Sequence, residues 1–456
     1  MTDTSAPFIK PIFCLILAIA IGGCGGGGSG KTASNQTNSE VGTDSSGDTI
    51  GSTEQSKPDA TDQSTTDANT DIENNTSPTT PLERINHFRA QAGLPSLSFQ
   101  YALAAAAENH ANYLLSYPTH GHDENEGNAG FTGQTASERT IFEGFFSRIV
   151  SENISQGNEN YAESIDGLMS AIYHRFGFLD STIDLIGFAN AETSETTAFV
   201  YNMANAAQNQ LCQSESTFES GRYYVDICKD TFVKIAVDDW ESTKLALQQN
   251  SDDIIIWPPI DGSDIVPVFY EESPDPLPDY SVSGQPISLE FNPEAVGDHS
   301  VVVTGFSLKK GNTEVAPIRA MDQSTDPNQK FSTLQFAWFP LERLDWNSTY
   351  AVRVDYEING AANSLSWQFS TRELPSAPID INASTELSMV SGDTIYLSFE
   401  PINGQSDGGI LSEYDSRQTL DIEQIDLETT KLTLSGPSGS QAKITKGQYV
   451  ISVTLE

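Results

Sequence analysis

The segment Thr80–Leu97, with the sequence TPLERINHFRAQAGLPSL, marks the point where a polar N-terminal region gives way to a folded domain. Thr80 and Glu83 have the spacing of a capping box, in which each side chain accepts a hydrogen bond from a backbone amide at the start of a helix. Apolar side chains follow at helical spacing, and Gly93-Leu94-Pro95 then provides a stop signal. The segment therefore predicts one amphipathic helix at the entrance to the first domain.

Helices and strands alternate beyond this segment. Helical periodicity returns over Phe99–Leu115 and Ala162–Tyr173, where apolar residues fall on one stripe. Two later runs, Leu185–Ala189 and Thr197–Asn202, have the composition of strands. Helices that flank a small sheet predict an α+β domain built as an α/β/α sandwich.

Six short segments between residues 81 and 210 occur in an order that resembles a known family. They are Leu82–Leu97, Ala104–Asn112, Gly121-His122 with Phe131-Thr132-Gly133 and Arg139, Ser151–Gly157, Tyr173-His174-Arg175 and Ile186-Gly187. In this order they resemble the CAP superfamily of SCP-like extracellular domains in its bacterial form. The resemblance implies export from the cytoplasm and a role in extracellular interactions or in binding sterol-like or lipid-like ligands.

The resemblance also implies a cleft, because in that family two histidines and one or two glutamates face a shared cavity. By position these residues are His122, His174 and Glu152, and Ala171 stands near the place of a second glutamate. Two imidazoles and one carboxylate form a three-ligand set for Zn²⁺ with an open fourth position. The same residues could equally form a hydrogen-bonded scaffold beneath the cleft, so both interpretations stay open.

Two further histidines bear on this cleft. His110 lies on an apolar helix stripe and is predicted to be a core residue, whereas His120 could replace or supplement His122. The sequence contains neither a G-x-S-x-G elbow nor an H-E-x-x-H helix. Catalysis would need Glu152 to act as the base for a metal-bound water, so we favour a binding role over an enzyme.

The N-terminus has the features of an export signal. Pro11–Ile21 is an apolar run, too short for the roughly 20 residues that span a bilayer but suited to the core of a signal peptide. Ile21-Gly22-Gly23-Cys24 resembles a lipobox, which implies cleavage of residues 1–23 and acylation of Cys24 as a membrane anchor. Because Gly25 follows and not Asp, we expect an outer-membrane or cell-surface lipoprotein if the organism is Gram-negative. An ordinary secretory signal with an incidental cysteine is the alternative.

The region after Cys24 and the charge of the whole chain together exclude several classes of partner. Residues 24–80 are rich in Gly, Ser, Thr, Asn and acids and predict a disordered acidic tether. Gly25–Thr32 (GGGGSGKT) matches the P-loop pattern, but no strand precedes it and no helix follows, so no nucleotide is expected to bind. The whole chain has 23 Lys and Arg against 63 Asp and Glu, a net charge of −40, which repels nucleic acid and anionic lipid headgroups and argues against both as electrostatic partners.

The C-terminal half predicts two β-rich domains. Cys212 and Cys228 should form a disulfide, because disulfides persist in exported proteins. We assign residues 81–255 to the CAP-like domain with a C-terminal extension. Residues 260–373 alternate as strands and resemble a bacterial Ig-like β-sandwich, and residues 374–456 predict a smaller β-domain.

These features predict a lipid-anchored protein outside the cytoplasm that binds a small apolar or cell-envelope ligand and is held to a membrane by Cys24. One alternative is a metal-dependent hydrolase of peptide or cell-wall substrates that uses His122, Glu152 and His174. Another is an adhesin in which residues 260–456 make the contact and the first domain serves as a platform. The sequence names no ligand.

Overall fold

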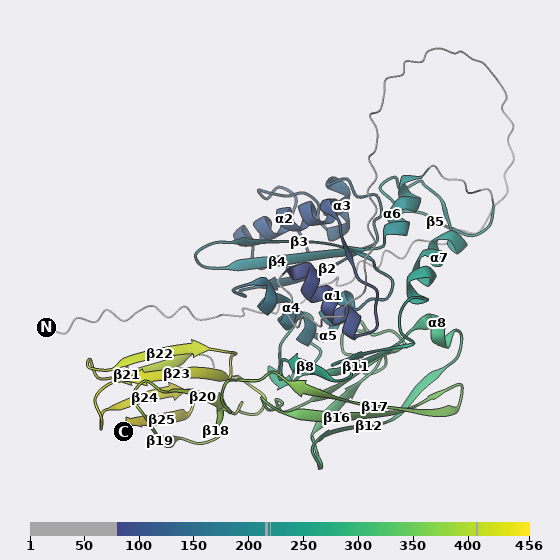
Figure 1. Cartoon of the computed structure of the whole chain (residues 1–456). Coiled ribbons are helices and arrows are strands. Elements are labelled where there is room, and N and C mark those ends of the chain that lie inside the picture. Colours follow the sequence, from purple (N-terminus) through teal and green to yellow (C-terminus); the bar gives the residue numbers. More distant parts are fainter. Residues whose placement is uncertain (1–79, 215–217, 219, 407–408) are drawn as a thin grey trace, which may run out of the picture.

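The computed structural model describes residues 80–214, 218, 220–406 and 409–456. The predicted signal peptide, Cys24 and nearly all of the acidic tether lie outside the described residues. Helices and strands are mixed in the first domain and strands dominate the rest, which confirms the predicted fold class (Figure 1). In the part of the chain that is described, no helix combines the length and apolar character that crossing a membrane requires.

The first domain is an α/β/α sandwich around a four-stranded sheet in the order β1-β3-β4-β2. Strand β1 runs parallel to β3, and the other pairs are antiparallel. Helices α2 and α3 cover one face of the sheet, and α1, α4 and α5 cover the other (Figure 1). The strands are β1 Ser98–Phe99, β2 Val150–Gln156, β3 Leu185–Glu192 and β4 Thr197–Ala204. The helices are α1 Pro81–Gln91, α2 Tyr101–Ser116, α3 Ala136–Phe142, α4 Tyr161–Ser170 and α5 Ile172–Phe178.

Helix α1 begins with the predicted capping box. The Glu83 amide donates to Thr80 Oγ1 at 3.2 Å, and the Thr80 amide donates to Glu83 Oε2 at 2.9 Å. These two bonds satisfy amides that have no partner inside the helix. The first turn of the domain is therefore specified by its local sequence.

The helix predicted over 162–173 is wrong as a single element. It divides at Ala171, whose φ of −76° and ψ of 118° are those of an extended residue. The buried Arg175 guanidinium explains the break, because it donates to the carbonyls of Met169 at 2.7 Å and Ser170 at 3.3 Å. These carbonyls lie in the last turn of α4 and would otherwise lack partners. Helix α5 can therefore start in a new direction.

A lobe held by a disulfide follows the sandwich. The Cys212–Cys228 bridge predicted from the sequence is present, with a Cα–Cα distance of 5.2 Å. It joins α6 to the segment before β6, and the cysteines pack with Ile227, Ile235 and Trp240 in a small core. The lobe comprises α6 Ala206–Gln213, β5 Tyr223–Tyr224, β6 Ile235–Ala236 and α7 Val237–Gln248.

The second domain is a β-sandwich of a four-stranded sheet, β14-β15-β11-β7, and a five-stranded sheet, β13-β12-β16-β17-β8. Its first strand begins at Ile254, inside the range that the sequence assigned to the first domain, because β7 pairs with β11. A tight turn at Asn359 (φ 51°) and Gly360 (φ 78°) joins β16 to β17, and this positive-φ pair is favoured by Asn-Gly. The elements are β7 Ile254–Trp257, β8 Gly262–Ile265, β9 Val268–Tyr270, β10 Val282–Gly284, β11 Ile287–Phe291, α8 Pro293–Val296, β12 Val301–Lys310, β13 Thr313–Glu314, β14 Ile318–Met321, β15 Gln335–Pro340, β16 Thr349–Ile358 and β17 Ala361–Thr371.

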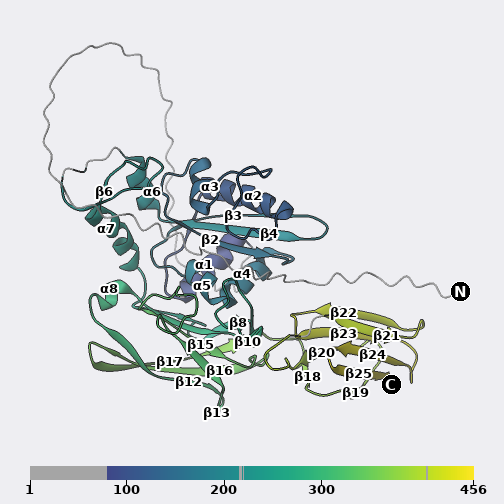
Figure 2. The same ribbon diagram turned by 180° about the vertical axis from the view of Figure 1, so that it is seen from behind.

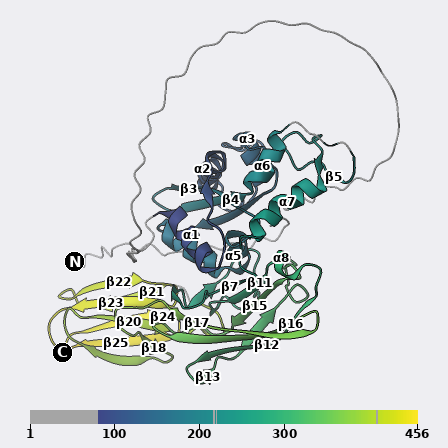
Figure 3. The same ribbon diagram turned by 45° about the vertical axis from the view of Figure 1, so that its right-hand side comes forward.

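The third domain contains two four-stranded sheets, β18-β20-β23-β22 and β19-β25-β24-β21, packed around their own apolar core. Seen from behind, it lies beside the second domain at the end remote from α7 (Figure 2). A view turned by 45° shows the same arrangement (Figure 3). The strands are β18 Ile379–Ile381, β19 Thr385–Met389, β20 Thr394–Phe399, β21 Ile410–Tyr414, β22 Thr419–Gln424, β23 Thr429–Ser435, β24 Gln441–Lys446 and β25 Tyr449–Leu455.

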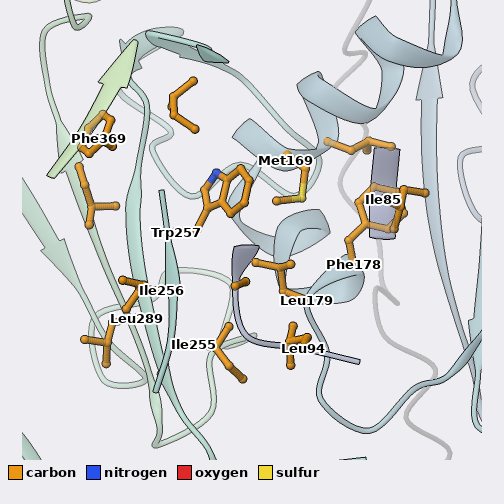
Figure 4. Packing of buried hydrophobic residues seen from close by; sticks show 14 of the residues in the cluster. Ile85, Leu94, Met169, Phe178, Leu179, Ile255, Ile256, Trp257, Leu289 and Phe369 are labelled. Atoms are coloured by element: carbon orange, nitrogen blue, oxygen red, sulfur yellow. The ribbon is translucent and has the colours of Figure 1, made fainter. Parts of the chain in front are cut away.

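The first and second domains share one apolar core. Ile85 and Phe178 of the sandwich belong to the same buried cluster as Trp257 and Leu289 of the β-domain. Figure 4 shows Met169 beside Trp257 at the junction. Burial of apolar surface between two domains favours a fixed arrangement, so these domains act as one rigid unit.

Candidate functional site around Glu152

Glu152 lies on the edge strand β2 and faces helix α3. Arg139, from α3, donates through Nη2 to both carboxylate oxygens, each at 2.8 Å. His122 Nδ1 donates to Oε1 at 3.0 Å. The Arg139 side chain is fully buried and that of Glu152 is only 3% exposed, so this is a buried ion pair with little access to water.

A second carboxylate completes the network. Glu124 Oε1 lies 2.9 Å from His110 Nδ1 and 3.8 Å from Arg139 Nε. The Thr132 amide donates to Glu124 Oε2 at 2.7 Å. His110 is fully buried, as predicted for a core histidine, and its Nε2 bonds to the Gly121 carbonyl at 2.9 Å. Arg139 thus lies between two carboxylates, each of which also pairs with a histidine.

The surrounding charges keep Glu152 ionised. Burial by itself would raise the pKa of Glu152, but the positive charge of Arg139 and the hydrogen bond from His122 outweigh it. They hold the pKa of this carboxyl well below its usual range. A carboxylate with so low a proton affinity, and with both oxygens engaged, is a poor general base.

His122 is the accessible end of the network, with 27% of its side chain exposed. Arg139 Nη1 donates to the His122 carbonyl at 3.0 Å, so the arginine holds the backbone as well as the carboxylate. His120, the predicted substitute, has another partner, because its Nδ1 lies 2.7 Å from the Tyr113 hydroxyl.

His174 is not part of this network. Neighbouring strand residues point to opposite faces of a sheet, and Asn153, next to Glu152, donates to the His174 carbonyl at 2.9 Å. His174 therefore belongs to the face covered by α5, opposite the face that carries His122. Its Nδ1 lies 2.8 Å from Glu272 Oε2, in the segment between β9 and β10.

The predicted metal ligands therefore do not converge. His122 pairs with Glu152 and His174 pairs with Glu272, on different faces of the sheet. Glu152 already accepts from Arg139 with both oxygens. Among the described residues, no group of three or more His, Cys, Asp or Glu side chains could hold a metal ion. The donor set does not fit the open three-ligand zinc site that the sequence suggested.

The segment Tyr173-His174-Arg175 joins the first domain to the second. The Tyr173 hydroxyl donates to Asp326, and the Tyr173 amide lies 3.3 Å from Glu272. The buried Arg175 Nη1 donates to the Pro286 carbonyl at 2.8 Å and to Ser288 Oγ at 3.0 Å. All three residues of this segment thus contribute contacts across the domain boundary.

Sequence reasoning missed the partners of these residues. The family resemblance includes Arg139 but implies no role for it, and it does not include Glu124 or Glu272. The sequence does not mark Arg139 as buried; once the structure buries it, its guanidinium needs carboxylate partners, and these are Glu152 and Glu124. No local signal marked Glu272, which lies 98 residues from His174 in the chain.

Comparison with known proteins finds a family match within the first domain. Residues 82–204 match the family model of the CAP, or cysteine-rich secretory protein, family. An outer surface protein of Borrelia burgdorferi is 18% identical, with a TM-score of 0.24, over 27% of this chain and 86% of that protein. An extracellular SCP-domain protein of Bacillus anthracis is 17% identical, with a TM-score of 0.23, over 26% of this chain and 38% of that protein. No curated protein matches the chain in sequence.

Proposed function

We propose that the protein is a lipid-anchored binding protein outside the cytoplasm and not a hydrolase. The proposal starts from the premise that residues 82–204 are a CAP domain. Its ligand is a small apolar or cell-envelope molecule. The surface around His122 makes the contact, and Cys24 carries the membrane anchor.

The observation that carries the proposal is the saturation of Glu152. A metal-dependent hydrolase would need this carboxylate either to ligate the metal or to take a proton from the attacking water. Its oxygens instead accept two bonds of 2.8 Å from Arg139 and one of 3.0 Å from His122. This arrangement suits a fixed scaffold beneath a recognition surface.

The rigidity of the first two domains also supports a binding role. Arg372, the residue after β17, donates to Asp166 of α4 at 2.7 Å, and the same aspartate accepts from Arg84 of α1. Together with the contacts of Tyr173-His174-Arg175, this ion-paired aspartate fixes α4 and α5 against the β-sandwich. A preorganised surface loses less conformational entropy on binding.

The location outside the cytoplasm rests on two features of the chain. The Cys212–Cys228 disulfide is of a kind that persists in oxidising compartments. The apolar leader and the Cys24 lipobox supply a route of export and an anchor. Labelling with radioactive palmitate tests the anchor, and the proposal expects the label to be absent from Cys24→Ala.

Native mass spectrometry of the protein extracted from its own envelope tests the binding role. We expect a non-covalent ligand on the wild type, with occupancy about tenfold lower in His122→Ala. His299 is an exposed histidine in the second domain, so His299→Ala is the matched control and should retain the ligand. Hydrolysis of peptide or cell-wall material that disappears in Glu152→Gln would contradict the proposal.

A further inference from the structure

The segment between β9 and β10 contains an Asp-Pro peptide bond, Asp275–Pro276. In such a bond the aspartate carboxyl can attack the carbonyl carbon of its own residue, because the two groups are held close and the proline nitrogen belongs to a tertiary amide. The Asp275 side chain is half-buried, and Pro276 and Leu277 are buried. The structure therefore holds a bond of this reactive type in a fixed environment.

Hydrogen bonds fix the atoms around this bond. Asn328 Nδ2 donates to the Asp275 carbonyl at 2.7 Å, and this is the carbonyl of the Asp275–Pro276 bond. A donor on a carbonyl oxygen stabilises the negative charge that develops there during attack. The Leu277 amide donates to Asp275 Oδ1 at 2.7 Å, whereas Oδ2 has no hydrogen-bond partner among the described residues. The carboxyl is therefore restrained, with one oxygen available to react.

The junction between the first two domains holds the donor in place. Asn328 Nδ2 also donates to the Tyr173 hydroxyl of α5 at 3.1 Å, and the Asn328 backbone amide donates to Asp326 Oδ1 at 2.9 Å. Packing of α5 against the β-sandwich thus directs a side-chain amide at the Asp275 carbonyl. An unfolded chain has no donor fixed at this position.

The surroundings of Asp275 favour its protonated form. Burial, together with nearby carboxylates, outweighs the bond from the Leu277 amide and raises the pKa of Asp275 to about 6. A carboxyl that keeps its proton near neutral pH can pass that proton to a leaving nitrogen. The charged or titratable groups around it are Glu271, Glu272 and Asp279 on its own segment and Tyr173, His174 and Asp326 on the elements packed against that segment.

We propose that the protein cuts its own chain between Asp275 and Pro276. Asp275 Oδ2 adds to the carbonyl carbon of the same residue, the bond from that carbon to the Pro276 nitrogen breaks, and the carboxyl proton passes to that nitrogen. The cyclic anhydride left on Asp275 takes up one water and becomes a C-terminal aspartate. Strand β7 pairs with β11 and β8 pairs with β17 across the cut, so the two fragments stay joined as a two-chain protein.

The other Asp-Pro bond of the chain, Asp326–Pro327, is an internal control. The Asp326 carboxyl is buried and engaged at both oxygens, so it has no oxygen available to attack. Its partners are the Tyr173 hydroxyl and the backbone amides of Asn328, Lys330 and Phe331. We expect this bond to stay intact in the folded protein.

Intact-mass spectrometry of the mature chain, residues 24–456 with Cys24→Ser, tests the inference. The protein is purified at about pH 8, moved to about pH 5.5 and sampled over time under denaturing conditions. We expect fragments 24–275 and 276–456, whose masses add up to the parent mass plus one water. Their rate of formation should not depend on protein concentration. Above about pH 6 the rate should fall by about tenfold per pH unit, because the protonated carboxyl is the reacting form.

Variants separate the roles of the two side chains. Asp275→Ala should abolish the cut, and Asn328→Ala should slow it about a hundredfold, because it removes the donor on the carbonyl oxygen. Asn363→Ala, at an exposed asparagine of β17, is the matched control and should be cut at the wild-type rate. An unchanged thermal transition confirms that each variant is folded. In guanidinium chloride at the same pH, both Asp-Pro bonds should break slowly and at similar rates.

Several results would overturn the inference. They are absence of the two fragments near pH 5.5, equal cutting at Asp275 and Asp326 in the folded protein, or the same rate in the folded and unfolded chains. Fragments that still form in a folded Asp275→Ala variant would do the same. A rate that rises with protein concentration would assign the cut to another molecule and not to the chain itself.

Discussion

Replacing Glu152 with glutamine removes one of the two carboxylates that neutralise a fully buried guanidinium. Arg139 loses the carboxylate charge at 2.8 Å and keeps Glu124, whose Oε1 is 3.8 Å from its Nε. Removing one partner of a buried ion pair costs about 3–5 kcal/mol of unfolding free energy. Because Glu124 remains and glutamine retains one acceptor, we expect the lower end, about 3 kcal/mol. That loss corresponds to a decrease in Tm of about 6–12 °C for a domain of this size.

Urea and thermal unfolding followed by circular dichroism measure this loss, with Glu126→Gln, an exposed carboxylate in the same region, as the control. The pKa of Glu152 is lower in the folded state than the usual value near 4.3, so its contribution is complete above about pH 5. The contribution is lost as pH falls toward the folded-state pKa. The difference in unfolding free energy between wild type and Glu152→Gln should therefore be constant from pH 8 to 5 and shrink below about pH 4. A difference under about 0.5 kcal/mol at pH 7 would refute a stabilising role for the network.

Three further perturbations test the account. Arg175→Met removes hydrogen bonds to the second domain and should lower the free energy of unfolding by about 3 kcal/mol. It should also open the segment between α7 and β7, residues 249–253, to proteases; an unchanged digestion pattern would count against the rigid junction. Burial raises the pKa of Glu290 to about 8 in the folded state, whereas the pKa of an unfolded glutamate is near 4.3. Between these two pH values the Glu290 carboxyl is protonated in the folded state and ionised in the unfolded state. The free energy of unfolding therefore falls as pH rises from about 4.3 to 8. Glu290→Gln should remove this pH dependence, so that the variant is more stable than wild type at pH 8 and equally stable near pH 4. A stability gain that does not change with pH would contradict this role of Glu290. Reducing the Cys212–Cys228 bridge, whose cysteines are 16 residues apart, should cost about 3 kcal/mol, seen as a lower urea midpoint.

The sequence predicts those parts of the molecule that depend on local chemistry. The capping box at Thr80 is predictable because its two residues lie three positions apart in the chain. The Cys212–Cys228 disulfide is predictable because the other two cysteines, Cys14 and Cys24, belong to the predicted leader and lipobox. The break at Ala171 was not readable, because it depends on a buried Arg175 that binds the carbonyls of the preceding turn. A periodic pattern of apolar residues continues across such a break unchanged.

The candidate site divides in the same way. His122 and Glu152 are 30 residues apart on elements that the resemblance already placed together, and they do meet. His174 was expected beside them, yet its partner Glu272 comes from the second domain, which the sequence treated as a separate module. Pairing between domains depends on how they pack, and no local pattern in either domain encodes it.

The central claim is that His122, Glu152 and His174 are structural and recognition residues and not metal ligands. Zinc titration by isothermal calorimetry tests this claim most directly. We expect His122→Ala and His174→Ala to leave the zinc isotherm of the mature chain unchanged. A stoichiometric zinc site in the wild type that is lost in both variants would contradict it.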